Sequence, residues 1–251
     1  MSGWLQARVI ENRRWAPGLF TLRVEAPALR FEAGQFVRIA LDLVPGDEAS
    51  RVARPFSFVN APGDPVLEFY GIEVPEGPLS PRLARLASGD TLLVADNPNG
   101  FLVLSEVPAA EDLWLVSTGT GLAPFLSILR AGEAWTRYRR VVLVHAVRRA
   151  EELAYREELL ALARVRGDAF RYVTFASREE HAGSLAGRIP AALADGRLEA
   201  AAGISVSAQR SQVMLCGNPD MLKDVQALLV ARGMKKHRRR SPGQITVESF
   251  W

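Results

Sequence analysis

The amino-acid sequence predicts a two-domain protein of the β + α/β class. We expect an antiparallel β-barrel in residues 1–106, followed by a doubly wound parallel α/β domain in residues 107–251. The chain has 251 residues, and since a domain usually holds about 100–150 residues, two domains are expected. The first part alternates β-rich runs with turns, and the second alternates strand and helix patterns. The change of pattern sets the boundary near residues 106–111.

The barrel prediction depends on β-rich runs that are separated by turns containing proline, glycine and aspartate. Residues 35–41 alternate, with Val37, Ile39 and Leu41 on one face. Further runs cover residues 56–59, 66–74 and 91–95. One short helix is expected over residues 81–87, with Ser80 as its N-cap and Pro81 at its first position. Many short strands with one brief helix favour a small closed barrel.

The second domain reads as buried strands that alternate with amphipathic helices. Strands are expected over residues 112–117, 141–146, 170–175 and 213–216. Helices are expected from residue 124 to 130, from 151 to 166 and after Asn218, where Asn218 would be the N-cap and Pro219 the first helical residue. This alternation is typical of a parallel sheet with helices on both faces.

Composition excludes several classes of protein. Hydrophobic residues make up 48% of the chain and charged residues 24%, as in ordinary globular proteins. No apolar run approaches the ~18–20 residues that cross a bilayer, and residues 1–8 lack the pattern of a secretory signal, so we expect a cytoplasmic protein without membrane contact. The single cysteine, Cys216, excludes an internal disulfide, a cysteine-built zinc site and a cysteine-held iron–sulfur cluster, and no metal is expected.

The basic residues are almost all arginines. Only three of the 31 basic residues are lysines, and the formal net charge is +3. So small a net charge does not indicate nucleic-acid binding, but arginine binds phosphate groups in a bidentate manner. The densest basic run covers residues 235–240, and a solvated surface is its simplest interpretation.

A glycine turn follows the first strand of the second domain. Residues 118–121 read Thr-Gly-Thr-Gly, and a helix begins directly after them. Such a turn lets backbone N–H groups approach a pyrophosphate at a helix N-terminus. A tight strand–helix turn without a ligand remains the alternative.

Arginines follow the next strands, where a dinucleotide would present its adenosine ribose. NAD-binding folds place an acidic residue after the second strand to bind the 2′-hydroxyl, whereas this chain has Arg148 and Arg149. Ser177 and Arg178 follow the third strand, and Arg188 comes shortly after. Taken together, these residues favour a 2′-phosphate, and therefore NADP over NAD.

Three further motifs point to a flat, phosphorylated ligand in the barrel. Residues 54–57 read Arg-Pro-Phe-Ser, which offers a cation, an aromatic ring and a hydroxyl on one strand. Residues 77–81, Gly-Pro-Leu-Ser-Pro, lead into the short helix over residues 81–87, whose N-terminus is a second place that could bind phosphate. The chain ends Glu-Ser-Phe-Trp, and an aromatic terminus suggests stacking on a ring. Taken singly, the first two motifs are more simply explained by a strand and a capped helix. For the aromatic terminus, ordinary packing into the barrel is the alternative.

In this order, and with residues 67–70 (Leu-Glu-Phe-Tyr) and 213–219 (Val-Met-Leu-Cys-Gly-Asn-Pro), the motifs resemble those of bacterial ferredoxin (or flavodoxin)–NADP reductases, which are FAD enzymes. The resemblance covers essentially the whole chain. It implies a FAD-binding barrel and an NADP-binding α/β domain whose C-terminal tail contacts FAD. It also implies hydride transfer between nicotinamide C4 and FAD N5, with the electrons exchanged singly with a ferredoxin or flavodoxin.

The resemblance also assigns residues to the two cofactors. Arg54 would meet the FAD pyrophosphate, Phe56 would stack on the isoalloxazine and Ser57 would bond its N5 edge. The remaining FAD contacts would come from both domains and the terminus: Pro55, Tyr70, Gly71, Ile72, Glu73, Pro78, Leu79, Ser80, Thr120, Phe250 and Trp251. The NADP contacts would be Val147, Arg148, Ser177, Arg178, Arg188, Asn218, Pro219 and Asp220. Cys216 would lie beside the nicotinamide, and Ser57, Cys216 and Glu248 are the expected catalytic residues.

The sequence departs from the family where Phe56 and Phe250 replace common tyrosines, which leaves stacking intact but removes a hydroxyl. We expect an acidic ferredoxin or flavodoxin to dock near Lys235, Lys236, Arg238, Arg239 and Arg240, and the enzyme to be a monomer. Two alternatives remain: an oxygenase reductase component or free-flavin reductase, and a non-catalytic module that senses NADPH or binds a partner. Dihydroorotate dehydrogenase subunits of this architecture need cysteines that the chain lacks.

Overall fold

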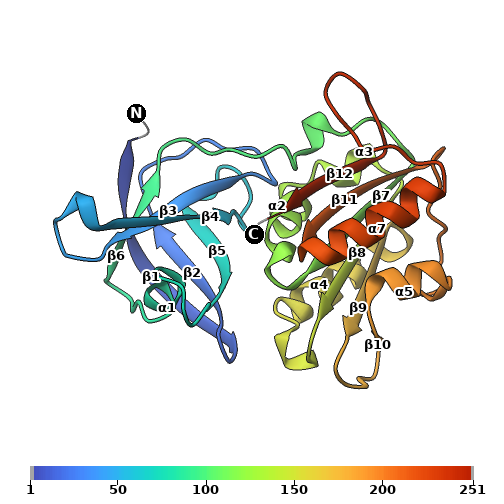
Figure 1. Cartoon of the computed structure of the whole chain (residues 1–251). Coiled ribbons are helices and arrows are strands. Elements are labelled where there is room, and N and C mark those ends of the chain that lie inside the picture. Colours follow the sequence, from blue (N-terminus) through green and yellow to red (C-terminus); the bar gives the residue numbers. More distant parts are fainter. Residues whose placement is uncertain (1–2, 250–251) are drawn as a thin grey trace.

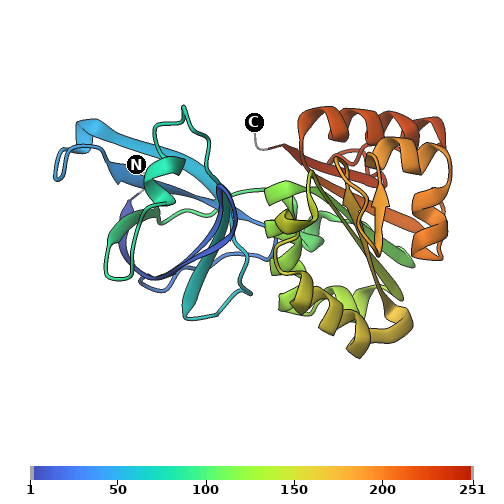
Figure 2. The same ribbon diagram turned by 90° about the horizontal axis from the view of Figure 1, so that it is seen from below.

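A computed structural model describes residues 3–249 of the chain. An N-terminal sheet curls into a barrel, and a C-terminal sheet with helices on both faces lies beside it (Figures 1 and 2). The predicted combination of an antiparallel barrel and a parallel α/β domain is confirmed. No helix within residues 3–249 is both long and apolar enough to cross a membrane.

The barrel is a six-stranded antiparallel sheet with the order β4-β3-β6-β1-β2-β5. A bridge between Phe58 and Phe69 joins its two edges, and the backbone N–H of Val59 donates to the carbonyl of Glu68 at 2.9 Å. The strands are β1 (Trp4–Ala16), β2 (Leu19–Glu25), β3 (Phe36–Asp42), β4 (Arg51–Ser57), β5 (Val66–Ile72) and β6 (Thr91–Ala95). The short helical turns are η1 (Glu48–Ser50), α1 (Ser80–Leu83) and η2 (Leu104–Glu106).

The barrel core comes from alternate residues of these strands. Val9, Phe20, Leu22, Ile39 and Phe69 are all fully buried in it. The hairpin of β1 and β2 turns at Gly18, whose φ of +76° lies in the left-handed region that glycine adopts at little cost. Strand β4 lies at one end of the strand order, where a proline at position 55 is tolerated because an edge strand needs fewer N–H donors.

The short helix after the barrel strands differs from the prediction. It covers only Ser80–Leu83, and Leu79 is its N-cap residue. The prediction that Ser80 caps the helix is wrong, because the Ser80 hydroxyl instead accepts a hydrogen bond from the backbone N–H of Val74 at 2.9 Å. Pro81 does lie in the first turn.

The second sheet is parallel throughout, with the strand order β10-β9-β8-β7-β11-β12. Its strands are β7 (Asp112–Thr118), β8 (Arg140–Val147), β9 (Phe170–Ala176), β10 (Ser184–Ala186), β11 (Ser211–Gly217) and β12 (Ile245–Ser249). The helices are α2 (Ala123–Ala131), α3 (Ala134–Arg137), α4 (Arg156–Arg166), α5 (Ile189–Ala194), α6 (Arg197–Ala202) and α7 (Pro219–Ala231), with the 3₁₀ turns η3 (Gly119–Leu122), η4 (Ala150–Glu152) and η5 (Gly167–Ala169).

Alternate residues of the parallel strands build two separate cores. Leu113 and Leu115 of β7 pack against α2 and α4, whereas Trp114 and Val116 pack against the helices on the opposite face. Figure 2 shows α7 and α4 on opposite sides of the sheet. The first core also contains Leu19 and Tyr70 of the barrel, so the two halves share apolar contacts.

Two further predictions need correction. The helix expected over residues 151–166 begins only at Arg156, because η4 and a left-handed Tyr155 (φ +58°, ψ +11°) precede it. Residues 245–249, for which no strand had been predicted, form strand β12 in parallel register with β11. Phe250 and Trp251, expected to contact FAD, lie outside the described residues.

Candidate functional site

A cavity of about 410 Å³ lies where the barrel meets the glycine turn of the α/β domain. It brings together most of the residues expected around FAD from distant parts of the sequence. Its walls are formed by Arg54, Pro55, Phe56, Ser57, Tyr70, Gly71, Ile72, Val74, Gly77, Pro78, Leu79, Ser80, Thr120 and Ala123. Val74, Gly77 and Ala123 had not been predicted. Gly77 begins the Gly-Pro-Leu-Ser motif, whereas only the fold brings Ala123 to the barrel.

Strand β4 forms one wall of the cavity with a cation, an aromatic ring and a hydroxyl. Arg54 is exposed, and its guanidinium bonds only the carbonyl of Ala53 within the described chain. Ser57 is buried, and its Oγ has no hydrogen-bond partner among residues 3–249. A buried hydroxyl without a partner is costly, so a ligand atom that bonds it would remove that cost.

Strand β5 and the turn before α1 form a second wall, next to β4. The Tyr70 ring is buried, and its hydroxyl has no partner in the described structure. A Cβ on Gly71 would lie 2.8 Å from atoms of both Phe20 and Phe56, so glycine is required for the Phe56 ring to lie where it does. Glu73 does not line the cavity. Its backbone N–H donates to Gly18, and its carboxylate lies 4.0 Å from Arg14.

The third wall is the glycine turn after β7, which packs directly against the end of β11. A Cβ on Gly121 would lie 2.5 Å from the carbonyl oxygen of Cys216. Gly217 has a φ of +131°, and the next residue, Asn218, donates its backbone N–H to the Thr118 hydroxyl at 2.8 Å. The backbones at the carboxyl ends of β7 and β11 are therefore in direct contact. Gly121 and Gly217 are required there, because a side chain at either position would clash with the other backbone.

A buried histidine on the neighbouring strand β8 forms a hydrogen bond with the same turn. His145 of β8 is fully buried, and its Nε2 lies 3.3 Å from the Gly119 carbonyl. Burial lowers the pKa of His145 to about 4, an effect that the contact with Gly119 opposes. The ring is therefore neutral at physiological pH. It donates one hydrogen bond to the turn, a structural role that had not been predicted.

Cys216 and Glu248 lie side by side on neighbouring strands, as the paired residues of the β11–β12 register. Burial raises the pKa of Glu248 to about 7, which a hydrogen bond from the Phe101 backbone partly offsets. Its Oε1 is buried without a partner in the described chain. Burial, reinforced by the Glu248 charge, raises the pKa of the Cys216 thiol well above its usual value. The cysteine is therefore a thiol and not a nucleophilic thiolate.

The residues expected around NADP lie at or just after the carboxyl ends of β8, β9, β10 and β11, outside the walls of the cavity. The backbone N–H of Arg178 donates to the carbonyl of Arg148 at 2.9 Å, and that of Ser177 to Val147 at 3.0 Å. Arg148, Arg178 and Arg188 are exposed, and within residues 3–249 none of them pairs with a carboxylate. Asn218 caps α7 through its side chain, and Pro219 and Asp220 are exposed beside it.

The basic run after α7 forms a hairpin that begins and ends beside the start of β12. Lys235, Lys236, Arg238 and Arg240 are exposed. Arg239 differs, because it makes three hydrogen bonds to the Glu106 carboxylate and lies 4.3 Å from the centre of the Phe101 ring. Its charge is thus partly neutralised, while the hairpin is brought close to Phe101, which bonds Glu248.

Comparison with known proteins identifies the family. Residues 115–227 match the model of the oxidoreductase NAD-binding domain. The chain is 46% identical to a flavodoxin/ferredoxin–NADP reductase of Shigella flexneri and 45% identical to that of Escherichia coli K12, in each case over the full length of both chains.

A solved structure leads to the same result. The ferredoxin NADP+ reductase of Neisseria gonorrhoeae, determined with bound FAD and NADP, is 34% identical and superposes with a TM-score of 0.92 over 99% of both chains. Sequence identity at this level over the whole length, together with the cavity between barrel and glycine turn, assigns the protein. The chain belongs to the flavodoxin/ferredoxin–NADP reductase family.

Proposed function

We propose that the protein transfers electrons between NADP(H) and a ferredoxin or flavodoxin, with FAD as its resident cofactor. The main observation in support of this proposal is the cavity that lies between the Arg-Pro-Phe-Ser strand and the Thr-Gly-Thr-Gly turn. Family membership, and the FAD and NADP of the neisserial relative, support both cofactors. FAD supplies a centre that accepts a hydride at N5 and releases the two electrons singly.

The residues of the cavity fit FAD. Phe56 offers an aromatic face for the isoalloxazine, and the partnerless Ser57 hydroxyl is available to its N5 edge. Arg54 has no carboxylate partner in the described chain and is available to the pyrophosphate. Tyr70, Gly71 and Ile72 would contact the ribityl chain, with Glu73 toward the adenosine. Pro78, Leu79 and Ser80 would bind phosphate, and Thr120 would reach the flavin from the second domain.

The arginines at the carboxyl ends of the parallel strands fit NADP. Arg148, Arg178 and Arg188, with Ser177, would bind the 2′-phosphate, and Val147 would contact the adenosine, because unpaired guanidiniums provide charge-assisted hydrogen bonds to phosphate. Asn218, Pro219 and Asp220 would close over the nucleotide from the start of α7.

The polar edge of the reaction site would be formed by Ser57 and Glu248, with Cys216 shaping the nicotinamide pocket. Glu248 is a neutral acid below about pH 7, so it can donate a hydrogen bond or release a proton near the flavin. The buried thiol of Cys216 presents a small apolar surface. The protein need only hold the two rings in contact and exclude water.

The carrier would dock on the basic hairpin. Lys235, Lys236, Arg238 and Arg240 are exposed cations, and Arg239 would fix the hairpin beside Phe101 through Glu106. Such a surface attracts an acidic carrier. We expect the enzyme to act as a monomer in the cytoplasm.

The experiment compares three acceptors with the purified enzyme: a ferredoxin, a flavodoxin and free flavin. We expect the protein to show flavin absorbance and to reduce both carriers with NADPH faster than free flavin. Faster reduction of free flavin would instead favour a flavin reductase. A colourless protein that binds NADPH without turnover would indicate a sensing module.

A further inference from the structure

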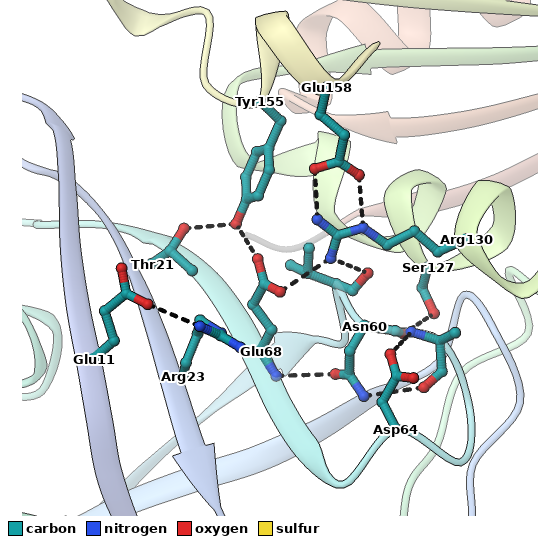
Figure 3. Close-up of polar contacts among 12 residues, drawn as sticks. Glu11, Thr21, Arg23, Asn60, Asp64, Glu68, Ser127, Arg130, Tyr155 and Glu158 are labelled. Atoms are coloured by element: carbon teal, nitrogen blue, oxygen red, sulfur yellow. Dashed lines mark hydrogen bonds and ion pairs between the residues drawn. The ribbon is translucent and has the colours of Figure 1, made fainter. Parts of the chain in front are cut away.

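A partly buried polar network connects the barrel to the α/β domain close to the cavity. Figure 3 shows its centre, where Glu68 of β5 meets Arg130 of α2 and Tyr155, the residue before α4. The Tyr155 hydroxyl donates to Glu68 Oε1 at 2.9 Å. Arg130 donates to Glu68 Oε2 at 3.0 Å and makes two hydrogen bonds of 2.8 Å to Glu158. The barrel therefore contributes one carboxylate, and the other domain contributes the donors.

On the barrel side of the network the hydrogen bonds run in one direction, from Trp15 through Thr21 and Tyr155 to Glu68. The Trp15 indole N–H donates to the Thr21 hydroxyl at 2.8 Å, so the Thr21 hydrogen is free for the Tyr155 oxygen at 2.6 Å, and the Tyr155 hydrogen goes to Glu68. Burial, and the charge of Glu68, keep the pKa of Tyr155 well above its usual value, so the phenol remains a donor. Only a carboxylate can accept from both Tyr155 and Arg130, because an amide would turn an N–H₂ group toward one of them.

Tyr155 is in a strained conformation that the network requires. Among residues 3–249 it is the single non-glycine residue with a φ in the left-handed region, which costs about 1–2 kcal/mol. Its ring packs edge-on against Tyr70, with 5.6 Å between ring centres, and lies 4.7 Å from that of Trp15. Tyr70 itself lines the cavity. The strained turn thus brings the phenol to the back of the cavity wall.

Helix α2 carries a second set of contacts to the same part of the barrel. Ser127 donates to the Asn60 carbonyl at 2.7 Å, and Arg130 donates to the Val59 carbonyl at 3.2 Å. Residues 59–60 follow Ser57 of β4 almost directly, while Ala123, at the start of α2, lines the cavity. One helix is therefore bonded to the barrel just beyond the flavin-stacking strand and begins at the glycine turn.

We propose that Glu68, Arg130 and Tyr155 form an interdomain clamp that sets the distance between strand β4 and the glycine turn, and so act as positioning residues for hydride transfer. The apolar contacts between the domains are not directional, whereas the hydrogen bonds of the clamp select one arrangement. This inference rests on the proposed function. In that reaction the C4–H bond of NADPH breaks and its hydride carries both electrons to N5 of FAD, which gives NADP+ and reduced FAD.

The geometry of this step makes positioning important. Reacting atoms must approach to about 3–3.5 Å, and a displacement of about 1 Å costs roughly a hundredfold in rate. We therefore test Glu68→Gln and Tyr155→Phe. The first removes the shared carboxylate, and the second removes one hydroxyl and leaves the ring packing intact. The matched control is Glu11→Gln, which breaks the 2.9 Å pair of Glu11 with Arg23 within the barrel (Figure 3).

The first readout is the interdomain distance, which does not depend on catalysis. Nitroxide labels on Ser88→Cys in the barrel and Val230→Cys on α7 would be measured by double electron–electron resonance in the FAD-loaded full chain. Both positions are exposed and the natural Cys216 is fully buried, so we expect the label to react with the two introduced cysteines alone. We expect a broader distance distribution in both clamp variants and an unchanged one in the control.

The second readout is the hydride-transfer rate in rapid mixing at saturating NADPH, together with NADP+ and FAD affinity. We expect Glu68→Gln to slow the step at least about tenfold and Tyr155→Phe to slow it less, with both affinities within about twofold of wild type. An unchanged distance distribution overturns the clamp. A broadened distribution with an unchanged rate overturns its positioning role. If the wild type reduces neither carrier, the proposed function fails while the distance measurement still tests the clamp.

Discussion

The protonation of Glu248 gives a prediction about stability that can be worked out from its surroundings. Burial raises the pKa of this carboxyl from 4.5 to about 7 in the folded chain. In the unfolded chain the group titrates near 4.5, so between these values only the folded state retains the proton. The stability that the neutral acid contributes is therefore fully present below pH 4.5 and is lost as the pH rises through 7.

The magnitude follows from the size of the shift. One pKa unit corresponds to about 1.4 kcal/mol, so the change from 4.5 to about 7 corresponds to about 3.5 kcal/mol. Glu248→Gln replaces the acid by a neutral group of the same shape at every pH. We expect the free energy of unfolding of the variant, relative to wild type, to increase by about 2–3 kcal/mol between pH 5 and pH 8.

Urea unfolding of the FAD-saturated proteins at pH 5, 6.5 and 8, followed by tryptophan fluorescence, measures this difference. Glu106→Gln is the matched control. Hydrogen bonds from Arg239 hold the pKa of Glu106 below its usual value, so that carboxylate is charged in both states across this range. Its difference from wild type should be flat with pH. A flat difference for Glu248→Gln would refute the assignment of a neutral, buried acid.

Three further predictions concern the cofactor, the carrier and the glycine turn. Arg148→Ala should raise KM for NADPH roughly 10–150-fold with little change in kcat or in the NADH reaction. Arg149→Ala is the control and should have a small effect, because the Arg149 guanidinium lies 3.7 Å from the Glu179 carboxylate. Steady-state kinetics with NADPH and NADH measure both variants, and a wild type that prefers NADH would contradict the predicted 2′-phosphate site. Association with an acidic carrier should slow markedly with salt, since the Debye length falls from ~10 Å at 0.1 M to ~3 Å at 1 M; stopped-flow mixing measures it, and a small neutral acceptor should show no such dependence. Gly121→Ala should lower the free energy of unfolding by about 1–3 kcal/mol, because its Cβ would lie 2.5 Å from a buried backbone carbonyl, and an equally stable variant in urea would contradict this close approach.

The elements that were predicted correctly are those with strong local sequence signals. Strand β6 (Thr91–Ala95) has the predicted bounds, and the Asn218 cap and Pro219 start of α7 are as expected. These features depend on the chemistry of neighbouring residues, such as a side-chain oxygen that accepts from the N–H groups of Asp220 and Met221. Such interactions join residues only two or three positions apart, so the sequence alone is enough to predict them.

Predictions failed where distant contacts override local preference. Residues 151–155 have helical composition, yet the helix starts at Arg156 because the Tyr155 hydroxyl reaches Glu68 and Thr21 across the domain boundary. Ser80 has the chemistry of an N-cap, yet its hydroxyl bonds Val74. In both cases the side chain bonds a partner that lies outside the predicted helix.

The sequence by itself determined the fold class, because strand, helix and turn patterns are local along the chain. It also predicted contacts to the two cofactors, and the structure brings most of the predicted FAD contacts to one cavity. Only the tertiary structure decided how the domains meet. The polar network of Glu68, Arg130 and Tyr155 and the raised pKa of the half-buried Glu248 depend on burial and on residues far apart in the chain. Burial and orientation are properties of the packed molecule, and no local pattern specifies them.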